Sequence, residues 1–206
     1  MKRNNIFWVS YSDLMTSLFF IMLVLFVVSI GYLQFQKNAT EKQLEKINEL
    51  QTAVKKLPEK YFEYQPKYKR FKLNRQIQFD LGKSKLKEEY HQYLIEVGES
   101  INKLLDSLNS DKKYNNFDIK YLVVVEGMAS KDNYYQNFEL SYSRALSLYR
   151  LWKNNISGVI FNPEQCEIQI SGSGTEGIRE YRDSLEYKNQ QFLIHIIPKI
   201  GKIIDK

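Results

Sequence analysis

The stretch that decides the fold of most of this 206-residue chain is IKYLVVV, residues 119–125, an almost uninterrupted apolar run. Its length and its β-branched and aromatic residues predict a buried strand. Apolar residues at helical spacing flank it over residues 86–108 and 138–154. Three further strands are predicted, over residues 71–79, 167–170 and 191–197. Strands that alternate with helices in this way predict an α/β domain with two layers, one of helices over one sheet.

Upstream of this domain, residues 36–70 are expected to form a linker that contains a short coiled coil. Apolar residues recur there at spacings of three and four, at Leu44, Ile47, Leu50 (or Gln51), Val54 and Leu57. The narrow stripe favours pairing of two copies, with a lone solvated helix or disorder as the alternatives. Pro58 and Pro66 interrupt any helix, so residues 59–74 are expected to be an extended connector.

The net charge of +6 is concentrated in this linker. Residues 37–75 hold eleven Lys and Arg against five Glu, whereas residues 76–206 hold seventeen bases against eighteen acids. A nucleic-acid-binding domain carries its basic stripe on the fold itself. We therefore expect no nucleic-acid partner.

The N-terminal segment predicts a membrane span. Residues 14–33 are almost entirely apolar, and about 20 apolar residues cross the hydrocarbon core of a bilayer. We expect one transmembrane helix over residues 7–35, after a short cytoplasmic segment, residues 1–6. The alternative is a cleaved signal peptide, which also begins with a basic run such as Lys2-Arg3. Against it, the apolar run is too long, an acid precedes it and no small-residue cleavage site follows.

Asp13 is the one formally charged residue between Asn4 and Gln36. A carboxylate at membrane depth costs about 2.5–3.5 kcal/mol on insertion scales, and such residues usually mark ion or proton paths. The alternative is that Asp13 lies at the membrane interface and caps the helix, as Ser10 or Ser12 also could. The apolar residues before Asp13 favour the functional interpretation.

Residues 7–16, FWVSYSDLMT, closely resemble the signature that opens the membrane helix of flagellar stator B subunits, the MotB family. The resemblance implies that Asp13 carries ions in the bacterial inner membrane, with the N-terminus cytoplasmic and the C-terminal domain periplasmic. Charge alone does not fix this orientation. The implied partners are a second copy of this chain, as a homodimer, and a ring of five multi-span MotA-like A subunits.

By the same resemblance, three further residues are expected to support ion transfer at Asp13: Tyr11, Thr16 and Ser17. Hydroxyl oxygens at positions 16 and 17 could help to strip water from sodium, but they serve equally in helix packing. A proton needs only the carboxylate. The sequence therefore favours protons over sodium.

A second resemblance covers the C-terminal part. Gly127 and the pattern Asn137-x-x-Leu140-Ser141-x-x-Arg144-Ala145 resemble the core motif of OmpA-like peptidoglycan-binding domains. The resemblance implies such a domain over residues 71–206, with Asn137, Leu140 and Arg144 binding peptidoglycan. Asn137 and Arg144 lie seven residues apart and thus on one helix face. From the residues alone, Asn137 could equally be an N-cap and Arg144 part of a surface ion pair.

Two positions depart from the OmpA-like pattern. The usual Gly-His-Thr-Asp reads GMAS at residues 127–130, so the wall-binding Asp is missing and Asp132 is only a displaced candidate. The usual Asn-Arg-Arg near the end reads NQQ at residues 189–191. Ion conduction is therefore better supported than wall binding.

The short N-terminus, the FWVSY form of the signature and VVEG at residues 124–127 resemble the B subunit of the Zorya anti-phage system, a stator relative. The expected function is thus the B subunit of an ion-driven rotary motor that is anchored to peptidoglycan. The alternative is a structural tether between membrane and wall without ion flux. A sensor is disfavoured because its cytoplasmic stub would be very short.

No enzyme, cofactor or metal site is expected. His91 and His195 have no second ligand at metal-binding spacing. The run SGSG, residues 171–174, is not followed by the Lys and Ser/Thr of a phosphate-binding loop. No nucleophile and base stand out as a pair, and a single cysteine, Cys166, precludes an intramolecular disulfide.

Overall fold

The structure, a computed structural model, describes residues 4–110, 117–132, 134–154 and 158–203. The chain divides into two compact units, an N-terminal unit, Met1–Lys46, and a C-terminal unit, Ile47–Lys206. Half of the expected cytoplasmic segment, residues 1–3 with Lys2 and Arg3, lies outside the described residues. The C-terminal unit begins upstream of the domain start that the sequence suggested at residue 71.

Helix α1 spans Asn4–Val54, and its first part is strongly apolar. Phe7–Asn38 comprises 32 residues with a mean hydropathy of 2.6. Among the described helices it is the one long and apolar enough to cross a membrane, by length and composition alone. At 1.5 Å per residue it is about 48 Å long, against about 30 Å for a hydrocarbon core. The long N-terminal helix expected from the sequence is confirmed.

The last residues of α1 contribute to the C-terminal unit. Val54 and Leu57 are buried and belong to its hydrophobic core. The helix ends at Val54, and Pro58, which lacks an amide hydrogen, prevents its continuation. The part of the expected linker up to Val54 is helical, and pairing of two copies stays a prediction. Val54 and Leu57, two residues of the predicted apolar stripe, pack into the core of their own chain.

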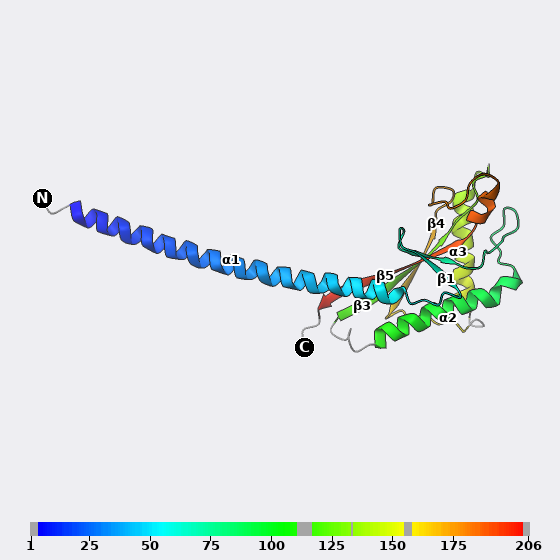
Figure 1. The fold of residues 1–206 in the computed structure, drawn as a ribbon, viewed down its shortest axis with the longest axis horizontal. Helices are drawn as coiled ribbons and strands as arrows, with labels where there is room; N and C mark the ends of the chain where they lie inside the picture. The colour runs from blue at the N-terminus through cyan, green and yellow to red at the C-terminus, as the bar shows by residue number, and fades with distance from the viewer. Residues whose placement is uncertain (1–3, 111–116, 133, 155–157, 204–206) are drawn as a thin grey trace. The chain divides into compact units, whose positions relative to one another are not determined.

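In the described residues of the C-terminal unit, a five-stranded mixed sheet is accompanied by the long helices α2 and α3 and the short 3₁₀ helix η2 (Figure 1). The strand order is β1-β2-β5-β3-β4. The strands are β1 (Phe62–Gln65), β2 (Arg70–Leu73), β3 (Phe117–Gly127), β4 (Cys166–Gly172) and β5 (Phe192–Ile203). The helices are α2 (Glu88–Ser110), α3 (Asn137–Lys153) and η2 (Asp183–Asn189).

One apolar core joins the sheet to the helices. Tyr121, Val123 and Val125 alternate along β3 and are fully buried on the same face, as strand geometry requires. Apolar residues of α2 and α3 pack against them. Trp152 of α3 also donates a hydrogen bond from its indole Nε1 to the carbonyl of Leu94 in α2, at 2.7 Å. The predicted two-layer α/β fold is confirmed.

The sheet is antiparallel except where α3 connects two of its strands. β3 pairs with β5 in antiparallel register and with β4 in parallel register. Parallel neighbours need a crossover, and α3 supplies it between β3 and β4. This β-α-β arrangement brings the ends of β3 and β4 to the beginning of α3.

The extended connector expected over residues 59–74 is instead largely a β-hairpin. β1 and β2 pair from Phe62 with Leu73 to Gln65 with Arg70, and β2 continues onto β5. Burial of Phe62 and Phe71 stabilises this pairing, and Pro66 lies in the turn, where it removes no ladder hydrogen bond. The strand predicted over residues 71–79 therefore begins at Arg70 and ends at Leu73.

Two glycines let α3 lie directly on the ends of its flanking strands. Gly127 ends β3 and pairs with Gly172, which ends β4. A Cβ atom on Gly127 would lie 2.1 Å from the carbonyl oxygen of Ser141. A Cβ atom on Gly172 would lie 2.4 Å from the amide nitrogen of Tyr142. Side chains at either position would push α3 off the sheet.

We therefore expect Gly127→Ala to lower the free energy of unfolding of residues 47–206 by about 3 kcal/mol, because backbone must move to admit the methyl group. Gly82→Ala is the control, since its Cβ would meet nothing within 4 Å and its cost is the positive φ alone, about 1 kcal/mol. Urea unfolding followed by fluorescence of Trp152, the one tryptophan of this unit, measures both. Equal losses would contradict the packing argument.

Candidate functional site

Asp13 lies well inside α1 and does not cap it. The helix begins at Asn4, more than two turns before Asp13. Apolar side chains precede and follow the carboxylate, from Phe7 onward. The interpretation of Asp13 as an N-cap is therefore wrong, because its amide already lies in continuous helix.

Two of the three residues predicted to support Asp13 share its helix face. Thr16 and Ser17 follow it by three and four residues, which places them beside it on an α-helix. The Ser17 hydroxyl donates to the carbonyl of Asp13 at 2.9 Å, and the Thr16 hydroxyl donates to that of Ser12 at 2.7 Å. Tyr11, two residues before Asp13, lies on the opposite side, where its ring contacts Trp8.

The second set of predicted residues lies where β3 ends and α3 begins. Arg144, in the second turn of α3, is only 2% exposed. Its Nε donates to the carbonyl of Lys83 at 3.2 Å, and its Nη1 donates to that of Met128 at 3.5 Å. The guanidinium lies 4.5 Å from the centre of the Phe79 ring. The alternative of a surface ion pair is wrong, because Arg144 is buried.

Burial lowers the pKa of Arg144 to about 10, and the negative charge of Asp132 opposes this shift. The guanidinium still carries its charge at neutral pH. Its Nη2 donates no hydrogen bond within the described part of the chain. The buried cation therefore keeps one donor group that these contacts do not use, and its charge still attracts anions nearby.

Asp132, the displaced candidate for the missing wall-binding Asp, accepts hydrogen bonds from its neighbours. Asn137, the first residue of α3, donates from Nδ2 to Oδ1 of Asp132 at 2.8 Å. The amide of Tyr134 donates to the same oxygen at 3.0 Å, and the Ser130 hydroxyl donates to the other at 3.4 Å. The N-cap position belongs to Gln136, so the interpretation of Asn137 as an N-cap is wrong.

Leu140 does not join this polar cluster. It is half-buried in the first turn of α3, and its amide donates to the carbonyl of Gln136 at 2.9 Å. In the structure Asn137 bonds to Asp132, and Arg144 interacts with the same carboxylate through its charge, without a direct ion pair in the described part of the chain. Leu140 lies beside both on the helix. Peptidoglycan binding by these residues stays a prediction.

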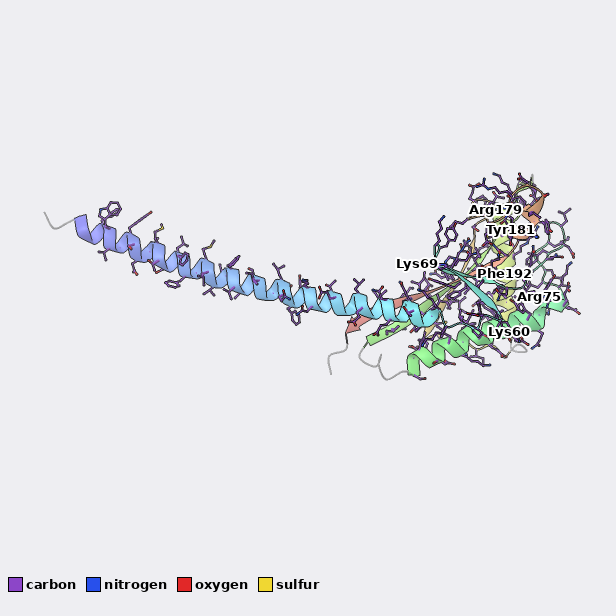
Figure 2. All side chains as sticks on the ribbon, viewed as in Figure 1. Lys60, Lys69, Arg75, Arg179, Tyr181 and Phe192 are labelled. Atoms are coloured by element: carbon purple, nitrogen blue, oxygen red, sulfur yellow. The ribbon has the colours of Figure 1, made fainter. Side chains whose placement is uncertain are left out.

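A network that the sequence did not predict lies next to this cluster. Arg179 donates from Nη2 to the carbonyl of Ala129 at 3.0 Å and forms an ion pair with Glu186. Asn189, which is fully buried, donates to Glu186 at 2.9 Å, and its Oδ1 accepts from the amide of Tyr181 at 3.2 Å. Figure 2 shows Arg179 and Tyr181 near each other at one end of the unit.

The network borders an open polar hollow of about 800 Å³. Its walls carry charges of both signs, from Lys131, Asp132, Arg179, Arg182, Asp183 and Glu186. Asp132 thus belongs both to the cluster around Asn137 and to this hollow. Such a surface can hold a ligand that carries both ammonium and carboxylate groups.

Other residues considered from the sequence are engaged in packing. His195 contacts Glu126 at 2.8 Å on the sheet, far from any other candidate ligand in sequence. Burial raises the pKa of the Cys166 thiol to about 11, which keeps it protonated and unreactive. Among the described residues, no three His, Cys, Asp or Glu side chains are grouped so that they could hold a metal ion.

The ion pair of Glu186 generates a prediction about acid stability. The hydrogen bond from Arg179 holds the pKa of Glu186 below its usual value, partial burial opposes this, and Asn189 assists it. A carboxyl with a lowered pKa stabilises the fold above its unfolded-state pKa, about 4.3, and this stability is lost as pH falls through the folded-state value. Glu186→Gln should therefore lose stability at pH 7 but converge with the wild type as pH falls through the lowered folded-state pKa.

Urea unfolding of residues 47–206 between pH 7 and pH 3 measures this convergence. Glu176→Gln is the control, since the exposed Glu176 accepts only a 3.4 Å hydrogen bond from Thr175 and should follow the wild type throughout. A difference between Glu186→Gln and wild type that stays constant with pH would contradict the ion pair.

No family model and no curated protein matches the chain. Among solved structures, it is similar to a periplasmic domain of MotB, with a TM-score of 0.43 and 17% identity over 63% of each chain. It is also similar to the periplasmic domain of Helicobacter pylori MotB, with a TM-score of 0.42 and 19% identity over 62% of this chain and 74% of that one.

A MotB-like protein from Desulfovibrio vulgaris is similar to it with a TM-score of 0.45 and 13% identity, over 80% of this chain and 99% of that one. The chain spans less than two thirds of the length of the first MotB structure, 63%. At such identities and TM-scores, these likenesses do not carry a function to this chain. A functional conclusion has to rest on its own residues.

Proposed function

We propose that this chain is the B subunit of an ion-driven membrane motor. In this proposal α1 crosses the bacterial inner membrane, with its N-terminus in the cytoplasm and the C-terminal unit in the periplasm. The observation that carries the proposal is Asp13, a carboxylate placed within a continuous apolar helix. Such a placement costs about 2.5–3.5 kcal/mol, which a merely structural anchor has no reason to bear.

Asp13 would work by alternating between an ionised form that attracts the ion and a neutral form that can move past apolar surfaces. The oxygens of Thr16 and Ser17 lie on the same helix face and can solvate the exchange. Tyr11, on the opposite face, would contact a neighbouring helix instead. A proton needs only the carboxylate as its binding group. We therefore propose protons, rather than sodium ions, as the transported species.

The proposed partners follow from the resemblance to stator B subunits. Two copies of this chain would stand within a ring of five multi-span A subunits. The exposure of α1 supports such an assembly, since none of the span Phe7–Asn38 is buried by its own chain. A carboxylate on such a helix is stable in a bilayer only when other helices surround it.

The C-terminal unit is proposed to anchor the motor to peptidoglycan. A stem peptide ends in carboxylates and can carry an ammonium group. Arg144 would attract the carboxylate, and the exposed Asp132, held in place by Asn137, would attract the ammonium group. Leu140 would supply apolar contact next to them.

The proposal includes a role in Zorya-type anti-phage defence rather than motility. It rests on the FWVSY form of the signature at residues 7–11 and on VVEG at residues 124–127. The identity of the neighbouring genes tests it, since helicase-like or nuclease neighbours favour defence.

The second candidate function is a tether without ion flux, favoured by the polar cluster at Asp132 and disfavoured by Asp13.

Asp13→Asn keeps the size and most hydrogen bonds of the side chain but fixes it in the neutral form. We expect it to abolish motor activity while leaving insertion and assembly with the A subunit intact. Asp13→Glu should retain part of the activity, because it still titrates. Motility or phage protection, as the partner genes dictate, measures the activity, and membrane levels of each variant serve as the control.

Normal activity from Asp13→Asn at wild-type membrane levels would exclude the motor and leave the tether. If Asp13→Asn lost both its activity and its membrane level, the variant would be unstable. The activity is then measured with Asp13→Asn co-expressed with its A subunit.

For the wall site, Asp132→Asn removes a charge and keeps an acceptor for the Asn137 amide. We expect it to weaken binding of residues 47–206 to isolated peptidoglycan about tenfold, the loss of one charge-assisted contact. Arg144→Lys should act similarly, and it avoids the buried cavity that Arg144→Ala would leave. A co-sedimentation titration measures the affinity, with the exposed Glu139→Gln of α3 as the matched control. Equal affinity of all four proteins would place the wall contact elsewhere.

A further inference from the structure

The positive charge of the chain is located on one element of the fold. Residues 55–75, here called the basic hairpin, comprise β1, β2, their turn and short flanks. They hold eight Lys and Arg against two Glu, which equals the net charge of the whole chain, +6. The rest of the protein is therefore neutral overall, and neither the proposed ion path nor the proposed wall site uses this charge.

Half of these bases are exposed and form no ion pair within the described part of the chain. Three are neutralised, since Lys60 pairs with Glu96, Lys72 with Glu180 and Arg75 with Glu89. Arg70 is buried and bonds to Gln65. The exposed lysines without a carboxylate within 4 Å in the described part of the chain are Lys55, Lys56, Lys67 and Lys69.

Tyrosine rings alternate with these lysines. The Lys55 ammonium lies 5.2 Å from the centre of the Tyr64 ring, and the Lys67 ammonium lies 5.3 Å from that of Tyr68. Lysine and tyrosine both combine an apolar body with a polar tip, which suits the boundary between water and a bilayer.

The turn of the hairpin holds a lysine where another residue would be more stable. Lys69 has a φ of 50°, in the left-handed region that glycine or asparagine adopts at lower cost. The turn itself is closed by the amide of Tyr68, which donates to the carbonyl of Gln65 at 3.1 Å. The turn therefore keeps the exposed Lys69 side chain at its tip at a modest cost in backbone conformation.

A hollow of about 290 Å³ opens beside this lysine. Tyr64, Tyr68 and Lys69 line one side of it, and Ile197 and Pro198 of β5 line the other. Gln51, in the last part of α1, also lines it. A cation beside phenol rings and apolar side chains forms a site for an anionic group that carries apolar or neutral atoms.

The proposed membrane span tethers this site to a membrane surface through a short stretch of chain. The apolar span ends at Asn38, and Lys55 follows it by 17 residues along the chain. Electrostatic attraction between lysines and a charged surface acts over about 8–10 Å at physiological ionic strength.

We propose that the basic hairpin binds the anionic phospholipid headgroups of the membrane that α1 crosses, with Lys55, Lys56, Lys67 and Lys69 as the contacts and the hollow beside Lys69 as a headgroup site. This inference rests on the proposed membrane span but on no ion flux or wall binding. Bound in this way, the hairpin would attach the C-terminal unit to the bilayer surface. Clusters of four or more bases next to a span bind anionic lipids on the cytoplasmic side of membranes, and the same electrostatic attraction acts on any leaflet that carries anionic lipids.

The test uses the full chain in lipid nanodiscs made either of phosphatidylcholine alone or with one third phosphatidylglycerol. Brief acetylation and mass spectrometry give the modification rate of each lysine. We expect the four hairpin lysines to react at least threefold more slowly in the anionic discs, and 0.5 M salt to abolish the difference. Lys103 and Lys120, exposed elsewhere on the unit, should react equally in both.

A charge-matched pair of variants adds a second readout. In Lys55→Gln/Lys67→Gln/Lys69→Gln, the remaining Lys56 should lose its protection by anionic lipid. In Lys103→Gln/Lys120→Gln/Lys199→Gln, which has the same net charge, Lys56 should keep it. Equal rates for the hairpin lysines in both kinds of disc would overturn the proposal. Protection that arises only when peptidoglycan is added, whatever the lipid, would also overturn it and assign the hairpin to the wall.

Incorporation into discs is scored separately. A chain that fails to enter them removes the membrane span on which both proposals depend. A chain that enters them but shows no lipid-dependent protection overturns this inference alone.

Discussion

The contact of the first turns of α3 with the ends of β3 and β4 is the constraint on which the C-terminal unit depends. It requires glycine at both strand ends, because backbone atoms of Ser141 and Tyr142 occupy the space where side chains would be. The close approach fixes the start of α3 above the sheet. Residues of α3 therefore meet the loops that leave both strands, and the polar cluster forms there and not at the opposite end of the helix.

Once α3 is fixed, the environment of Arg144 follows. A buried guanidinium loses its hydration, so it must be compensated by acceptors and by the face of an aromatic ring. The carbonyls of Lys83 and Met128 and the ring of Phe79 provide this compensation. They come from two segments, the connection between β2 and α2 and the loop after β3. The same residue thus joins these loops to the helix while its charge remains available to Asp132.

The elements that the sequence predicted well are those with a long and regular apolar pattern. The buried run in β3 and the helical spacing in α2 and α3 leave few alternatives, so the order of elements and the two layers were correct. The β1–β2 hairpin was missed because its strands are only four residues long and stand next to prolines. Short strands gain their stability from partners distant in sequence, here β5, and local pattern does not contain that information.

The candidate site was predicted in part for a similar reason. Asn137 and Arg144 lie on one helix, so their spacing places them on one face. Asp132 and Arg179 come from loops, and only the folded chain brings them to the helix. Asn189 is the one residue of the run NQQ, residues 189–191, that agrees with the OmpA-like pattern. Its side chain is buried and donates to the carbonyl of Tyr181, which accounts for an asparagine at this position.

The pairing of β2 with β5 has a mechanical consequence. This pairing comprises only two residue pairs, Phe71 with Ile194 and Lys72 with Leu193, whereas β3 and β5 are paired at ten positions. Suppose that the unit is held at the Asp132 cluster and pulled from its N-terminal end. The load then crosses the short β2–β5 seam before it reaches the long central ladder. Under such a load the hairpin would detach before the central ladder opens, because far fewer residue pairs hold it to the sheet.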